Sequence, residues 1–439
     1  MKRLALIFLL ALDFSLLTAS GQEMKPCGTS VFARRHQLHK RDGSSCVTRA
    51  TQKEPSLLCN FQGEKRGLII LVSFPDQAFS DEDPKTLWTA IANEEGYQGH
   101  GARGSISDYF RDQSYGQFKL TFDVAGPVEA KHPYGYYGEN IDWGEPTGWF
   151  DRNVAELVEE ACRGVADQVS FADYDWDGDG DVEQVFLLYA GHGENDYWAK
   201  DSTVIWPHMA MLSLDWGYEE GLVQQGVRID AYACSNEVNR SNGLAGLGSI
   251  CHEFSHCLGL PDLYNTETGR SVVGSYDLMD RGSYNGNGWC PAGYSSYERY
   301  ACGWLMPQAT GDVRTVETLA PLHEQPDVRI YRTSPEAGDY YLVECREKAL
   351  WDSYLPTAGM TAWHVDYDET AWEENTVNND PQHLRVERMP LGDVPAGILS
   401  VPAETPHHGF WYDLQGKRLL FKPSAPGLYI HNGKKESIR

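Results

Sequence analysis

The sequence predicts an α+β domain followed by a β-rich, sandwich-like domain, and three kinds of pattern carry this prediction. Residues 67–74 form a continuous apolar run between turn residues, which is typical of a buried strand. Residues 151–167 place apolar side chains on one helical stripe, and residues 117–124 alternate like a half-buried strand. Residues 313–365 are rich in β-branched and aromatic residues with proline and glycine between them, which predicts short antiparallel strands.

The length and composition set limits on the class of protein. A chain of 439 residues is long for one hydrophobic core, so two or more domains are expected. Apolar residues at 41% and aromatic residues at 12% argue against a largely disordered protein. The net charge of −26 argues against nucleic acid or an anionic membrane surface as a partner, and it fits calcium binding and solubility outside the cell.

The N-terminus has the features of a secretory signal peptide. Lys2 and Arg3 precede an apolar run at 4–17, and small residues lead to a cleavage site after Gly21. The run is too short and wrongly flanked for a membrane span, and no later stretch is long and apolar enough to be one. The sequence therefore predicts an exported protein, extracellular or attached to the cell surface.

The next segment, residues 22–65, is irregular and carries a basic cluster in an otherwise acidic chain. We interpret it as a pro-segment that keeps a zymogen latent and is later removed; the alternative is a solvated, poorly ordered terminus. A thiolate from this segment is one way to cap a metal in the latent form. The candidate cysteines for that role are Cys27, Cys46 and Cys59.

The strongest chemical signal is an H-E-x-x-H motif followed by a glycine and an aspartate. His252 and His256 lie on one face of a helix and can share a metal ion, while Glu253 can act as a general base. Gly259 ends the helix, and the turn returns Asp262 as a third ligand. Two nitrogens, one carboxylate and an open position are typical of a catalytic zinc site. The alternative is an ordinary helix that happens to carry two histidines. A bare H-E-x-x-H arises by chance in roughly one chain of this length in a hundred, and the glycine and aspartate at fixed offsets lower that by about two further orders of magnitude.

The stretch HEFSHCLGLPDLY resembles the zinc signature of the immune-inhibitor-A-type secreted metallopeptidases, which are metzincin-like. The resemblance covers roughly residues 66–385 and implies a zincin/metzincin-like catalytic domain. It also implies a methionine turn in SYDLMDRG, with Met279 as the apolar floor beneath the metal. One departure is Arg281, where many metzincins have a tyrosine; Tyr284 is the nearest downstream candidate for an oxyanion stabiliser.

Residues 412–418 (YDLQGKR) and 427–435 (GLYIHNGKK) form a C-terminal tail that resembles the short segments acting as sorting signals in secreted proteins of some Gram-negative bacteria. It implies such a source and a secretion machinery as a partner. The alternative is a terminal hairpin of residues 412–414 with residues 428–430. The whole predicted organisation is a signal peptide (1–21), a pro-segment (22–65), a zinc metallopeptidase domain (66–307), a β-rich domain (308–405) and the sorting-like tail (406–439).

A second candidate metal site is an acidic loop in which carboxylates alternate along the chain. Gly180 lies where a calcium loop needs a sharp turn, but the twelfth position is Phe186 instead of the glutamate of an EF-hand. We therefore predict a structural calcium site of non-EF geometry, with a solvated acidic turn as the alternative. Its candidate ligands are Asp175, Asp177, Asp179, Asp181 and Glu183.

The sequence thus predicts a secreted zinc endopeptidase that hydrolyses peptide bonds of proteins with a metal-activated water. Its partners would be protein or peptide substrates. Two alternatives stay open: a narrow-specificity amidase or exopeptidase, and a catalytically idle, surface-anchored binding protein on a peptidase scaffold. Other candidate ligands, His192, His208, Cys251 and Cys257, are interpreted as structural residues.

Overall fold

The structure is a computed structural model. It describes residues 61–142, 149–195, 203–309, 319–332 and 339–379, together with strands at 385–390, 411–412, 418–419, 427–431 and 434–438. The predicted signal peptide and nearly all of the predicted pro-segment lie outside these residues, as do Cys27, Cys46 and Cys59. In the part of the chain that the structure describes, no helix has the length and apolar character needed to cross a membrane.

The first sheet has five strands in the order β2-β1-β6-β10-β7. The first four run parallel, and the edge strand β7 pairs antiparallel with β10. The strands are β1 (Gly63–Ser73), β2 (Phe118–Glu129), β6 (Val185–His192), β7 (His208–Met211) and β10 (Ala231–Val238). This arrangement is the α/β part of the predicted catalytic domain.

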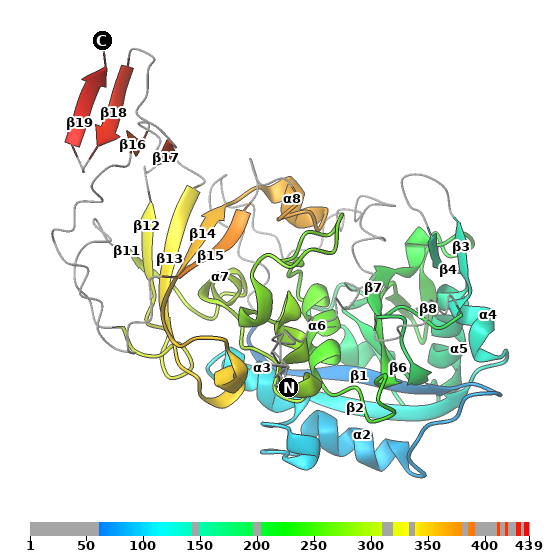
Figure 1. Ribbon diagram of the computed structural model, residues 1–439. Helices are drawn as coiled ribbons and strands as arrows, with labels where there is room; N and C mark the ends of the chain where they lie inside the picture. The colour runs from blue at the N-terminus through cyan, green and yellow to red at the C-terminus, as the bar shows by residue number, and fades with distance from the viewer. Residues whose placement is uncertain are drawn as a thin grey trace, which may run out of the picture.

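Both faces of this sheet are covered, which explains the unbroken apolar run in β1. Ile69 and Leu71 face one core, while Leu68, Ile70 and Val72 face the other, because side chains alternate along a strand. The first core also receives buried side chains from α2, α3 and α6, and the second receives them from α5. Figure 1 shows these helices around the strands of the sheet. These helices are α2 (Pro84–Asn93), α3 (Ile106–Gln113), α5 (Val154–Gly164) and α6 (Gly248–Cys257).

The predicted elements of this region are present with shifted ends. The strand expected at 67–74 is β1, the strand expected at 117–124 is β2, and the helix expected at 151–167 is α5. β1 begins at Gly63, so it includes residues that the sequence assigned to the pro-segment. Smaller elements complete the region: α4 (Tyr134–Gly138), β3 (Asn140–Asp142), β4 (Trp149–Asp151), β5 (Asp181–Val182), β8 (Leu222–Gln224), β9 (Val227–Ile229) and α7 (Ser296–Ala301).

A second sheet follows, in the order β11-β12-β13-β14-β15, antiparallel except for the β11–β12 pair. A sandwich would need a partner sheet, and the described residues between 308 and 405 form only this one. One face of the sheet joins the first core through buried residues such as Leu342 and Trp363, so the two regions share a core. The elements are β11 (Gln308–Ala309), β12 (Arg329–Arg332), β13 (Asp339–Arg346), β14 (Gly359–Asp366), α8 (Glu369–Glu373) and β15 (Arg385–Pro390).

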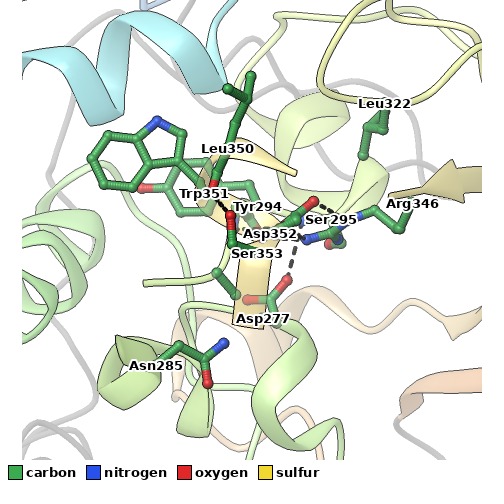
Figure 2. A network of polar contacts seen from close by, with 12 residues as sticks. Asp277, Asn285, Tyr294, Ser295, Leu322, Arg346, Leu350, Trp351, Asp352 and Ser353 are labelled. Atoms are coloured by element: carbon green, nitrogen blue, oxygen red, sulfur yellow. Dashed lines mark hydrogen bonds and ion pairs between the residues drawn. The ribbon is translucent and has the colours of Figure 1, made fainter. Parts of the chain in front are cut away.

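A buried polar network also ties the second sheet to the first region (Figure 2). Arg346 at the end of β13 makes two hydrogen bonds to Asp352, of 2.7 and 2.6 Å, and another of 3.0 Å to the carbonyl of Gly293. Close by, Asp277 accepts hydrogen bonds from the N–H groups of Met279 and Ser295. The segment at 293–295 therefore links the turn that carries Met279 to Arg346 of the second sheet.

In the tail, short strands form a separate antiparallel sheet in the order β17-β16-β18-β19. Tyr412 pairs with Ile430, which is the pairing expected for the hairpin alternative. Nothing in this pairing bears on sorting, which stays a prediction. The strands are β16 (Trp411–Tyr412), β17 (Arg418–Leu419), β18 (Gly427–His431) and β19 (Lys434–Ile438).

Candidate metal centre

The helix α6 ends where the sequence predicts, and its ending bends the chain back toward the helix. Gly259 is left-handed, with φ of +84°. Its N–H donates to the carbonyl of His256 at 2.8 Å, and the N–H of Leu260 donates to the carbonyl of Ser255 at 3.2 Å. These two bonds define a Schellman ending, which satisfies carbonyls of the last turn and reverses the chain.

Both histidines of the motif are held by backbone carbonyls through the same ring nitrogen. The Nδ1 of His252 lies 2.9 Å from the carbonyl oxygen of Leu278, and the Nδ1 of His256 lies 2.8 Å from that of Leu260. A neutral imidazole that donates from Nδ1 carries its lone pair on Nε2. This is the usual arrangement of metal-ligating histidines.

Asp262 lies where the two Nε2 atoms converge. Its Oδ1 is 3.2 Å from the Nε2 of His252 and 3.3 Å from the Nε2 of His256. All three side chains are buried, with exposed fractions of 5%, 7% and 0% for His252, His256 and Asp262. The structure thus brings the three predicted ligands together.

The spacing of these atoms fits a zinc ion. Two ligand atoms that each lie about 2.0–2.1 Å from a tetrahedral centre are about 3.3 Å apart. The two separations from Asp262 Oδ1, 3.2 and 3.3 Å, match that value. In addition, the buried Nε2 of His252 makes no hydrogen bond, although burying such an atom without a partner is costly. The donor set of two imidazoles and one carboxylate is also that of catalytic zinc.

The electrostatics of the site favour a positive charge. Burial by itself lowers the pKa of His252, but the carboxylates of Asp262 and Glu253 outweigh burial and raise that pKa to about 9. Burial opposes ionisation of Asp262, yet the imidazoles of His256 and His252 hold its pKa well below the ordinary value. The two carboxylates therefore stabilise a positive charge at this position.

One residue of the site, Asn375, is indicated by no sequence pattern. Its side-chain amide donates to Asp262 Oδ2 at 2.7 Å, and its Oδ1 accepts from the N–H of Asp262 at 2.6 Å. The two residues are 113 positions apart, and Asn375 lies in no metal-binding motif of this sequence. Only the tertiary structure identifies this contact.

Glu253 and Met279 are both buried, and each is the chain neighbour of a residue of the site: Glu253 follows His252, and Met279 follows Leu278. Glu253 is 2% exposed and follows His252 in α6. Met279 is fully buried, and its carbonyl accepts a hydrogen bond of 2.8 Å from Leu263, the residue after Asp262. The turn expected to lie beneath the metal is therefore bonded to the segment that carries the third ligand. The role of Tyr284, half-buried in the helical stretch at 281–288, stays a prediction.

The acidic loop differs from the predicted calcium set. The carboxylates of Asp175, Asp177 and Glu183 lie close enough to share an ion, while Asp179 and Asp181 are not in this group. Asp181 instead pairs with Arg228 at 2.8 Å. Several carboxylates are engaged by the loop itself: Asp175 accepts from the N–H groups of Gly178 and Gly180, Asp177 from Asp179, Asp179 from Asp181, and Glu183 from Trp176.

Another cluster, absent from the sequence prediction, joins His132 to Glu156 and Glu160. Lys131 pairs with Glu160 at 3.2 Å, and Tyr137 donates to the same carboxylate at 2.9 Å. Lys131 thus supplies a positive charge beside this carboxylate without a metal. We interpret this cluster as a local ion-pair network.

His208, Cys251 and Cys257 have the surroundings expected of structural residues. The two ring nitrogens of His208 lie 2.5 Å from the carbonyl oxygen of Trp206 and 3.0 Å from the hydroxyl of Tyr232, and burial lowers its pKa to about 4. Cys251 is fully buried, as expected of a small apolar residue, while Cys257 is only partly buried.

Comparison with known proteins places this site in a family. A protein of Vibrio cholerae named "Pre-pro-metalloprotease PrtV" is 27% identical over 288 residues, which cover 54% of this chain and 30% of the relative. A protein of Arthroderma benhamiae with the provisional name of secreted metallopeptidase is 28% identical over 234 residues, or 45% of this chain and 31% of the relative. The chain thus matches about a third of the length of these relatives.

A family model describes the catalytic domain that the sequence and the site both point to. It is the model of the immune inhibitor A peptidase M6 catalytic domain, and it matches residues 61–311. This span includes the whole first sheet, α6 and Met279, and it is more than half of the chain. The chain therefore belongs to the immune inhibitor A peptidase M6 family.

Proposed function

We propose that the chain is a secreted, zinc-dependent endopeptidase that hydrolyses peptide bonds of proteins. One observation carries the proposal: two buried imidazoles, each held at Nδ1 by a backbone carbonyl, direct Nε2 at the same carboxylate oxygen of Asp262. A random pair of helical histidines has no reason to share both features. Family membership supports peptide hydrolysis as the reaction.

His252, His256 and Asp262 would hold the zinc ion, which, when bound, activates a water molecule and polarises the scissile carbonyl. The carbonyls of Leu278 and Leu260 keep the Nδ1 protons in place, so that the Nε2 lone pairs stay available. The chain's own contribution is thus to fix three ligand atoms before the metal arrives.

Glu253 would transfer protons during the reaction. In our proposal its carboxylate accepts the proton of the attacking water and then delivers it to the leaving amine. Its burial favours this role, because a carboxylate shielded from bulk water keeps the proton within the site. Met279 would provide apolar support without touching the substrate.

Export and latency belong to the same proposal. One relative has "pre-pro" in its name and another is named as secreted, which supports a signal peptide at 1–21 and a pro-segment at 22–65. A sorting role for the tail at 406–439 is a further expectation. Calcium binding at Asp175, Asp177 and Glu183 stays a prediction with a structural role.

The decisive experiment is digestion of casein by the purified chain, before and after limited proteolysis of its N-terminal segment. Glu253→Gln changes one atom of the side chain and should lower kcat by about 10²–10⁴-fold while zinc stays bound. The matched control is Glu95→Gln, the same change on a side chain that is 87% exposed, which should leave kcat unaltered.

The other outcomes separate the alternatives. Full activity in Glu253→Gln would refute the proposed role of Glu253. Cleavage of short peptides or amides but never of casein would favour the narrow-specificity enzyme. Bound zinc without hydrolysis of any substrate, even after the N-terminal segment is removed, would favour the idle binding protein.

A further inference from the structure

The loop that carries the third ligand is clamped by a segment from outside the family match. Residues 372–379 begin within α8 (Glu369–Glu373), well beyond residue 311, and contact the loop at 259–266 from its first residue to its last. The contacts are hydrogen bonds from Trp372 Nε1 to the carbonyl of Gly259 (2.8 Å), from Asn378 Nδ2 to the carbonyl of Leu263 (2.8 Å), and from the N–H of Thr266 to Asn379 Oδ1 (2.7 Å).

One member of this segment contacts the ligand itself. Asn375 donates to Asp262 Oδ2 and accepts from the Asp262 N–H, with distances of 2.7 and 2.6 Å. Two bonds to one residue fix both its backbone and its carboxylate. Because both side chains are buried, at 3% and 0% exposure, bulk water does not replace these bonds.

The direction of these bonds matters for the metal. With Oδ2 held by the amide of Asn375, the other oxygen, Oδ1, faces the two imidazoles. An amide donor achieves this without adding a charge, so the carboxylate keeps its full negative charge for a cation. Hydrogen-bond partners of metal ligands commonly change metal affinity by about 10–100-fold.

Asn375 adopts an uncommon backbone conformation to make these contacts. Its φ is +54°, a left-handed value that asparagine tolerates better than most residues. The conformation is held by the tertiary structure, since the carbonyl of Asn375 accepts a 3.0 Å bond from Thr266 Oγ1 and its N–H donates to Trp372. The segment is thus built to present this side chain.

We propose that Asn375 is a positioning residue for Asp262, so that the metal centre is completed by the region beyond the family's catalytic segment. The proposal rests on the metal site of the proposed function. It predicts that the part of the chain matched by the family model, residues 61–311, does not by itself set the zinc affinity of this protein.

The test is the zinc affinity of the full chain, measured by competition with a chelator. Asn375→Gly deletes the side chain at a left-handed position where glycine is unstrained, and it should weaken zinc binding by about 10–100-fold. The matched control is Asn242→Gly, the same substitution at an exposed left-handed position (φ +60°) that contacts no residue of the metal site. It should leave the zinc affinity within about twofold of the unaltered chain, since only contacts to ligands carry this effect.

A second deletion separates affinity from stability. Asn375→Ala lacks the same amide but strains the backbone, so it should unfold at a lower temperature than Asn375→Gly and lose zinc affinity equally. If either variant is too unstable for titration, the zinc-dependent rise in its melting temperature reports affinity instead.

The outcomes are distinguishable. Unaltered zinc affinity in Asn375→Gly, or an equal loss in Asn242→Gly, would overturn the positioning role while leaving the zinc site intact. Failure of the unaltered chain to bind zinc would overturn the proposed function and this inference with it.

Discussion

Two regions of this protein have the sequence of a metal site, and they differ in how their ligand side chains are used. At His252, His256 and Asp262 the side chains are buried, and the atoms that do not face the shared centre are held by Leu278, Leu260 and Asn375. In the loop at 175–183 the carboxylates are half-buried or exposed and accept hydrogen bonds from the loop's own N–H groups or pair with Arg228.

The difference shows that the presence of ligand-type residues is weaker evidence for a metal site than the contacts that those residues make in the fold. Imidazole lone pairs and a carboxylate lose solvation in a dry site, so a set that converges there needs a positive charge, a metal ion or a proton, between its atoms. Carboxylates near water are screened, and backbone N–H groups are enough to satisfy them. The buried set therefore supports a metal far more strongly than the acidic loop does.

The largest expected effect is the loss of zinc affinity when one ligand of the buried site is removed. His256→Ala should lower the zinc affinity by more than the about 10–100-fold expected when a hydrogen-bond partner of a ligand is removed, because it removes a bond to the metal itself. Asp177→Asn in the acidic loop should keep both zinc and activity. Metal analysis of the two purified variants checks this, and zinc retained by His256→Ala would remove the histidines from the site.

An intermediate effect should appear as a pH dependence of zinc binding. Because the pKa of His252 is raised to about 9, binding must release its proton at lower pH. Apparent affinity should rise roughly tenfold per pH unit between about pH 6.5 and 9 and then level off. A competition titration across this range checks the slope, and a flat profile would contradict the raised pKa.

The same pKa has the opposite consequence for the metal-free chain. A histidine whose pKa is raised on folding stabilises the folded state fully below its ordinary pKa of 6.5, and that contribution is lost as the pH rises through about 9. Melting temperatures of the chelator-treated protein should therefore fall over this range, while those of the zinc-loaded protein fall less.

The smallest effect concerns calcium. If the loop binds the ion at Asp175, Asp177 and Glu183, millimolar calcium should raise the melting temperature by only about 2–4 °C, since existing bonds already satisfy much of the loop. Asp175→Asn should abolish the rise. No change in the unaltered chain would leave the loop as a solvated acidic turn.

Much of the fold followed from local patterns. The apolar run of β1, the alternation of β2 and the stripe of α5 were all predicted from the side-chain period of one element. The sandwich was only an expectation, and one sheet is described instead, with a face that shares the first core. Whether a β-rich segment pairs with itself or packs on another domain depends on residues distant in the chain, which periodicity does not report.

The sequence by itself determined the parts of the metal centre that span one helix and its turn. Spacing of four residues places His252 and His256 on one face, and Gly259 permits the left-handed ending that brings Asp262 back. Only the tertiary structure decided which Asp262 oxygen faces the imidazoles and that Arg228 engages Asp181. The physical reason is range: helix periodicity and turn conformations act between neighbours, whereas the hydrogen bonds that orient a ligand come from wherever the folded chain places a partner.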